Sequence, residues 1–110
     1  MRFYRIVLTD PPTLADFLSA AAQGRPARRN DPETLRLWTG ISVYETFEQA
    51  RDKALDFPML GHLIATLDIP EHTLIRAERT TSSRGHHTLW GEPADLLAHV
   101  VSIADLAWTS

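Results

Sequence analysis

Cysteine is absent from this 110-residue chain, which excludes disulfides and metal sites built on thiolates. This absence is typical of proteins from a reducing compartment. Long apolar runs are lacking too, because no stretch approaches the roughly 20 residues that a membrane helix requires. The opening residues also lack the apolar run of a signal peptide. We therefore expect a cytoplasmic protein that makes no membrane contact.

A surplus of positive charge is also missing. The chain has 11 Lys and Arg residues against 14 Asp and Glu residues, which gives a net charge of −3. General nucleic-acid binders carry a basic surplus, so nucleic acid is disfavoured as a partner. One local basic cluster, Arg25, Arg28 and Arg29, lies in a stretch rich in Gly, Pro and Asn. This composition indicates a solvated loop; the alternative is a site for a phosphate or an acidic partner.

Common catalytic motifs are missing as well. The chain has no phosphate loop, no three-glycine dinucleotide fingerprint, no Gly-x-Ser-x-Gly elbow and no zinc-protease helix. His86 and His87 are adjacent on an expected strand, where they point to opposite faces and cannot readily chelate one metal ion together. A zinc site would need ligands from elsewhere in the chain, so we expect no metal. Either histidine is a candidate general base or a structural hydrogen-bonding residue.

The chain does contain enough apolar material for a core, since hydrophobic residues make up 44% and charged residues 23%. Its length is common for one domain, so we expect a single domain over residues 1–110. Residues 34–38 fit either a short helix or a strand. The pattern of apolar residues and breakers predicts strands at 3–8, 41–44, 62–67, 72–79, 86–90 and 98–103, and a one-turn helix at 94–97.

Two longer helices are predicted from their first turns. Thr46 and Gln49 have the spacing of a capping box, and the helix that they begin ends before Pro58. Thr13 is a suitable cap for the other helix, which ends near Gly24 and carries an apolar stripe made of Leu14, Phe17, Leu18 and Ala21. Because helices come early and strands late, the order favours the α+β class, with a mixed or antiparallel sheet and both main helices packed on it.

The most distinctive segment spans residues 36–50. An aromatic-glycine turn at Trp38 and Gly40 leads into a strand bearing Ser42 and Tyr44, and that strand runs directly into the capped helix. The segment resembles the central motif of the RES (Arg-Glu-Ser) branch of the ADP-ribosyltransferase-like family. In that motif an arginine, an aromatic residue, a glycine and a strand-borne tyrosine precede a helix that carries an alanine.

Three further positions bear on this resemblance. Arg5 is similar to the arginine on the first strand of the family, and Ser82 or Ser83 is similar to its serine. Lys53 stands roughly where the family has a helical glutamate. The resemblance implies a cleft that binds NAD, and some members of the family transfer or release ADP-ribose.

Chemistry of this kind needs a cation for the pyrophosphate, an aromatic ring for the nicotinamide and a carboxylate that stabilises the cationic sugar. The candidates are Arg5 or Arg36 for the cation, Tyr44 or Trp38 for the ring and Glu48 or Glu92 for the carboxylate, with Ser42 and Ser83 as further cofactor contacts. In the leading hypothesis Arg5 holds phosphate, Tyr44 packs beside the nicotinamide, and His87 or Glu92 lines the cleft. The alternative is that the aromatic residues belong to the core.

Two other classes of function fit the same sequence. The chain lacks a complete catalytic set, is small and has three tryptophans, which is compatible with a non-enzymatic interaction or regulatory module, such as an antitoxin-like partner. The apolar run at Val100, Val101 and Ile103 would then offer an edge for pairing with a second copy in a homodimer. A domain that binds a small molecule without turnover is the third possibility.

Overall fold

The structure is a computed structural model that describes residues 1–80 and 85–108, the side chain of Trp108 excepted. The described strands are β1 (Arg2–Val7), β2 (Ile41–Tyr44), β3 (Leu63–Asp68), β4 (Arg76–Arg79), β5 (His86–Trp90) and β6 (Val100–Asp105). The helices are α1 (Pro32–Trp38), α2 (Phe47–Asp56) and α3 (Pro93–Ala98), and short 3-10 turns lie at η1 (Leu14–Phe17), η2 (Pro58–Leu60) and η3 (Leu106–Trp108).

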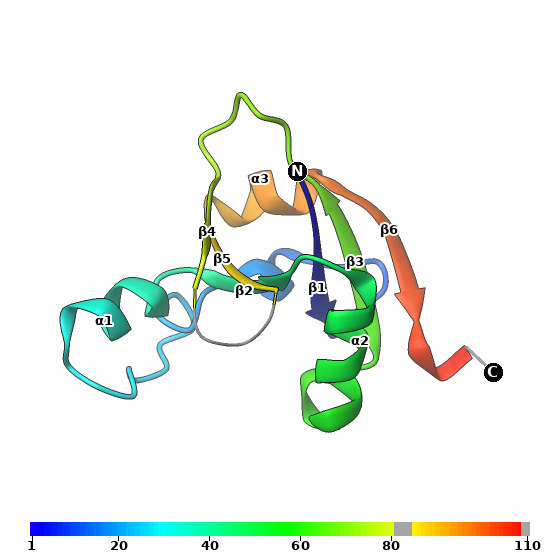
Figure 1. Cartoon of the computed structure of the whole chain (residues 1–110), viewed down its shortest axis with the longest axis horizontal. Helices are drawn as coiled ribbons and strands as arrows, with labels where there is room; N and C mark the ends of the chain where they lie inside the picture. Colours follow the sequence, from blue (N-terminus) through cyan, green and yellow to red (C-terminus); the bar gives the residue numbers. More distant parts are fainter. Residues whose placement is uncertain (81–84, 109–110) are drawn as a thin grey trace.

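The strands form one sheet in the order β4-β5-β2-β1-β3-β6, and each neighbouring pair is antiparallel. The described α-helices each lie between two strands in the sequence, but neighbouring strands of the sheet are antiparallel throughout, whereas an α/β fold has a mainly parallel sheet (Figure 1). The prediction of the α+β class is therefore confirmed, and of the two sheet types that were expected the antiparallel one is present.

The side chains of β1 lie on both faces of the sheet, because successive side chains on a strand point in opposite directions. Phe3 and Val7 are buried in the larger core, which also receives Phe17 from η1 and Leu96 from α3. Tyr4 and Ile6 pack on the other face. Alternation along the strand expected at 3–8 predicts Tyr4, Ile6 and Leu8 on one face and Phe3, Arg5 and Val7 on the other. The structure agrees within β1, whereas Leu8 lies beyond the strand and is 69% exposed.

Helix α2 covers the Tyr4 face. The side-chain hydroxyl of its N-cap, Thr46, accepts a hydrogen bond from the Gln49 main-chain N–H at 3.2 Å. The Gln49 side-chain oxygen in turn accepts one from the Thr46 main-chain N–H at 3.1 Å. This is the expected capping box. Ala50 and Ala54 are buried against the sheet, and Phe47 meets Tyr4 edge-on with ring centroids 6.2 Å apart.

The prediction of a long helix from Thr13 toward Gly24 is wrong. The helix is reduced to the single turn η1, and the next residue, Leu18, is already extended. The physical reason lies in Asp16, whose carboxylate accepts hydrogen bonds from the main-chain N–H groups of Leu8 and Thr13. These bonds fasten the turn to the end of β1, while Phe17 enters the core. Leu14, on the expected apolar stripe, is 50% exposed.

Other boundaries also differ from the sequence predictions. Residues 34–38, which fit either element, belong to helix α1, whose start is fixed by Asp31 accepting from the Thr34 N–H at 2.9 Å and by the proline at the first helical position. Strand β4 is limited to Arg76–Arg79, shorter than the expected 72–79. The last strand, expected at 98–103, is shifted by two residues to Val100–Asp105, and Ala98 still belongs to α3.

Candidate functional site

The described surface contains a groove of about 960 Å³. It opens where β1 and β2 separate. The two strands pair only at Tyr4 and Tyr44, whereas β1 continues along β3 as far as Val7. An unbroken antiparallel register would bring Ile6 opposite Ser42. The separation of the strands instead leaves the β2 main chain facing the groove.

Arg5 spans this separation. Its Nε donates to the Asp16 carbonyl oxygen and its Nη1 donates to the Ser42 carbonyl oxygen, each at 2.8 Å. The guanidinium also lies over the ring of Phe17, 5.9 Å from its centroid. Burial lowers the pKa of Arg5 to about 10, against the opposing effects of Asp16 and Tyr44. Arg5 is therefore still a cation at neutral pH, and it supplies the hydrogen bonds that the separated strands cannot exchange.

Asp16 is held beside Arg5 and is only 8% exposed. One carboxylate oxygen accepts from the Leu8 N–H at 2.8 Å, and the other accepts from the Thr9 hydroxyl at 2.5 Å and the Thr13 N–H at 2.9 Å. Burial on its own raises the pKa of Asp16, but these hydrogen bonds and the charge of Arg5 together hold it below its usual value. The carboxylate is therefore ionised, and it already accepts three hydrogen bonds from the protein.

The rim of the groove is basic. Arg25 and Arg28 line it from the loop that precedes α1, and Lys53 lines it from α2. Within the described part of the chain, no hydrogen bond or ion pair engages the guanidinium groups of Arg25 and Arg28. Trp38 also lines the groove and donates its indole N–H to the Arg25 carbonyl oxygen at 2.8 Å. This bond ties the loop to the end of α1.

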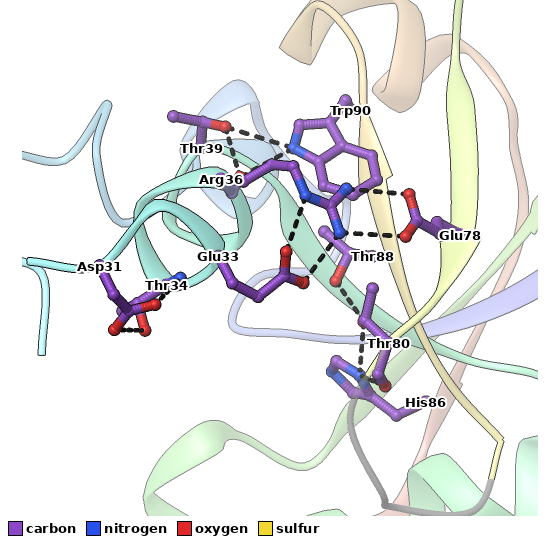
Figure 2. A network of polar contacts seen from close by, with 10 residues as sticks. All are labelled: Asp31, Glu33, Thr34, Arg36, Thr39, Glu78, Thr80, His86, Thr88 and Trp90. Atoms are coloured by element: carbon purple, nitrogen blue, oxygen red, sulfur yellow. Dashed lines mark hydrogen bonds and ion pairs between the residues drawn. The ribbon is translucent and has the colours of Figure 1, made fainter. Parts of the chain in front are cut away.

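Side chains from β2 and β5 line the floor of the groove and contact one another. Tyr44 is 8% exposed, and burial raises the pKa of its hydroxyl although Arg5 opposes the shift. Its ring meets that of His86 edge-on, with centroids 5.5 Å apart. The His86 Nδ1 lies 3.0 Å from the Thr80 carbonyl oxygen, and the Thr80 hydroxyl lies 2.6 Å from that of Thr88 (Figure 2).

The structure brings together only part of the residue set chosen from the sequence. Arg5, Trp38, Ser42 and Tyr44 all line the groove. Arg36, His87 and Glu92 do not line it, and Ser83 lies outside the described residues.

Arg36 is engaged in a network of its own (Figure 2). Its guanidinium donates two hydrogen bonds to Glu78, at 2.9 and 3.0 Å, and two to Glu33, at 2.8 and 3.1 Å. It also lies over the ring of Trp90, 5.1 Å from the centroid. The hydrogen bonds to Glu33 and Glu78 raise the pKa of Arg36 further. This network joins α1 to the edge strand β4 and leaves the guanidinium with little capacity for a ligand.

His87 and Glu92 occupy other places. The His87 ring packs against Phe3 with centroids 5.1 Å apart, on the core side of the sheet, and its Nδ1 lies 3.2 Å from the Gly85 carbonyl oxygen. Glu92 is exposed at the start of α3 and lines a smaller cavity of about 180 Å³, which adjoins the groove at Ser19 and Ile41. Glu48, the other candidate carboxylate, is exposed on α2 and does not line the groove.

Sequence reasoning missed four groove residues as ligand contacts: Arg25, Arg28, Lys53 and His86. His86 was considered only together with His87, and nothing in an adjacent pair tells which of them faces a ligand. Lys53 was noted only for its position in the resemblance. Arg25 and Arg28 belong to the basic cluster that favoured a solvated loop, and their alternative assignment to a phosphate site fits their place on the groove. The signal in the sequence that could have identified this part of the groove is the cluster of closely spaced arginines.

Comparison with known proteins gives no relative: no family model, no curated protein and no solved structure matches this chain. Over residues 1–80 and 85–108, no group of three or more His, Asp or Glu side chains is arranged to hold a metal ion. Nor does any helix in that part of the chain have the length and apolar character needed to cross a membrane.

Proposed function

We propose that this chain binds an anionic small molecule that carries an aromatic ring, with NAD or its ADP-ribose portion as the leading candidate. The observation that carries the proposal is the groove at the separation of β1 and β2, which combines cations on its rim with aromatic side chains on its wall and floor. Lys53 lies over the ring of Phe57, 4.3 Å from its centroid, so the rim cations without an ion-pair, hydrogen-bond or ring partner among the described residues are Arg25 and Arg28. The resemblance of residues 36–50 to ADP-ribosyltransferase-like proteins points to the same class of ligand.

The charge of the groove supports an anionic ligand. Four permanent cations line it, Arg5, Arg25, Arg28 and Lys53, against one carboxylate among the described residues, Asp16. The local balance is thus four minus one, or three positive charges, in a chain whose net charge is −3. A concave surface that concentrates one sign of charge attracts ligands of the other sign. Arginine guanidinium groups are also well suited to binding phosphate oxygens.

The size and lining of the groove support a nucleotide-sized ligand. Ligand sites commonly have volumes of roughly 300–1,000 Å³, and this groove, at about 960 Å³, falls near the upper end of that range. Trp38 and Tyr44 supply aromatic surface beside the basic rim. A ligand with both a phosphate and a planar ring would use both features, whereas a simple anion would use only the first.

The proposal concerns binding, and a transfer reaction stays a prediction of the resemblance alone. Transfer of ADP-ribose calls for a carboxylate that stabilises the positive charge on the sugar. In the part of the chain that the structure describes, the carboxylate lining the groove is Asp16, and its oxygens already accept three hydrogen bonds. The groove therefore supports a binding protein better than it supports a transferase.

The direct test is a calorimetric titration of ADP-ribose, NAD and AMP into the purified chain and into two variants. The double variant R25A/R28A is expected to bind about 10- to 100-fold more weakly, because hydrogen bonds to charged groups contribute roughly 1.5–3 kcal/mol each before the two effects overlap. The matched control is R29A, which removes the same charge from the same loop at a position that does not line the groove.

Binding that is lost in the double variant and kept in R29A supports the proposal. Weakening in both variants, in proportion to the charge that each removes, would mean that the loop acts only through its total charge. If none of the three compounds binds the unaltered chain at millimolar concentration, the nucleotide proposal is wrong and the interaction-module hypothesis becomes the stronger one.

A further inference from the structure

The contacts of His86 determine which of its two ring nitrogens carries the proton. Its Nδ1 lies 3.0 Å from the Thr80 carbonyl oxygen and 3.2 Å from the Thr80 hydroxyl oxygen. A carbonyl oxygen can only accept a hydrogen bond, so Nδ1 must carry the proton that is donated to it. In the neutral imidazole the other ring nitrogen, Nε2, is then an acceptor with a free lone pair.

The surroundings of the ring keep this arrangement in place. Thr80 is 6% exposed and its hydroxyl is hydrogen-bonded to that of Thr88, which is 3% exposed. Tyr44 packs edge-on against the imidazole. Among the described residues, no side chain or main-chain group hydrogen-bonds to Nε2. Since His86 lines the groove, this nitrogen is an acceptor that the groove can offer a ligand beside its many donors.

We propose that His86 is a specificity-determining residue of the groove, and that its Nε2 accepts a hydrogen bond from a hydroxyl or N–H group of the ligand. This inference rests on the proposed function and names the ligand class more narrowly. Arg25, Arg28 and Lys53 can only donate, so they select for negative charge and nothing else. An acceptor on the floor adds a requirement for a donor, which a sugar hydroxyl meets and a bare oxyanion does not.

His87 provides a matched control for this role. It is the next residue on β5, and its Nδ1 also contacts a main-chain carbonyl oxygen, that of Gly85, at 3.2 Å. Its ring faces the opposite side of the sheet, against Phe3, and it does not line the groove. The two histidines thus share strand, side chain and type of hydrogen bond, and differ in the face that they occupy.

The test compares three variants, H86N, H86Q and H87N, with two probes. Asparagine places its amide near the position of Nδ1 and can keep the bond to Thr80, but it has nothing at the position of Nε2. Glutamine extends far enough to place an amide oxygen near Nε2. The probes are ADP-ribose, which has hydroxyl donors, and sulfate, which is an anion without any donor at neutral pH. Thermal unfolding of each variant checks that it folds.

We expect H86N to weaken ADP-ribose binding about 2- to 10-fold, the equivalent of one net hydrogen bond, and to leave sulfate binding unchanged. H86Q should recover part of the loss, and H87N should match the unaltered chain. ADP-ribose binding that is the same in H86N as in the unaltered chain would overturn the inference while leaving the proposed function standing. Failure of the unaltered chain to bind ADP-ribose would overturn both.

A second measurement needs no ligand. The ¹⁵N chemical shifts of a histidine ring distinguish the nitrogen that carries the proton from the one with a lone pair. We expect the neutral imidazole of His86 to carry its proton on Nδ1 and a lone pair on Nε2, which is the less common tautomer of histidine in solution. A proton found on Nε2 would overturn the inference whatever the binding data show.

Discussion

Replacing Asp16 with alanine is expected to lower the free energy of unfolding by about 3 kcal/mol. The carboxylate is 8% exposed and accepts from Leu8, Thr9 and Thr13 at 2.5 to 2.9 Å. Its removal leaves two main-chain N–H groups and a hydroxyl without the acceptor around which η1 is folded. Because these bonds attach η1 to the end of β1, the wall of the groove should loosen together with the fold. Urea denaturation monitored by circular dichroism measures the effect.

The exposed D52A variant is the control, and it should change the free energy of unfolding by less than about 0.5 kcal/mol. A D16A variant as stable as the unaltered chain would show that the hydrogen bonds of Asp16 contribute nothing to stability.

The pH dependence of stability gives a second readout of the same carboxylate. The pKa of Asp16 is lowered in the folded state, so its contribution is complete above the unfolded value of about 3.9 and is lost as the pH falls through the lower, folded value. The stability difference between D16A and the unaltered chain should therefore shrink in acid.

Replacing Arg5 with alanine is expected to lower the free energy of unfolding by about 2 kcal/mol. The guanidinium donates to the carbonyl oxygens of Asp16 and Ser42 and packs over Phe17. Without it, the separated ends of β1 and β2 lose the side chain that joins them. The same denaturation experiment measures the loss.

The control for Arg5 is R2A, which removes an arginine from the same strand. The Arg2 side chain is 57% exposed, and among the described residues its ion-pair partner is Asp68, which is 54% exposed. R2A should change stability little. R5K adds a further comparison, since lysine keeps the charge but cannot donate from two fixed nitrogens of a planar group. A fully stable R5K would assign the role of Arg5 to its charge and contradict the role in bridging the two strands.

Local signals in the sequence predicted much of the fold. The alternation of Phe3, Tyr4, Ile6 and Val7 placed the right residues on each face of β1, and the spacing of Thr46 predicted the start of α2. Both features depend on neighbouring residues, so a single sequence contains them. The helix expected from Thr13 failed because Asp16 bonds with β1, a contact that depends on the fold. Its apolar stripe continued past Phe17 in the sequence, although the chain turns away there.

The candidate site was predictable only in part, for the same reason. Residues close to the junction of β2 and α2, among them Ser42 and Tyr44, could be selected because the chain itself brings them together. Arg36 was selected as a free cation, but Glu78, 42 residues further along, engages it. His87 was selected in place of His86 because the sequence does not tell which face of β5 meets the groove. That choice depends on the pairing of β5 with β2.

The measurement that tests the central claim most directly is a nuclear magnetic resonance titration of the labelled chain with ADP-ribose. The account predicts that the largest shift changes fall on the groove, at the side chains of Arg25 and Arg28, the Trp38 indole N–H and the His86 ring. It also predicts that these changes are lost in R25A/R28A. Changes that cluster around Glu92 and the smaller cavity, or that persist undiminished in the double variant, would contradict the assignment of the groove as the binding site.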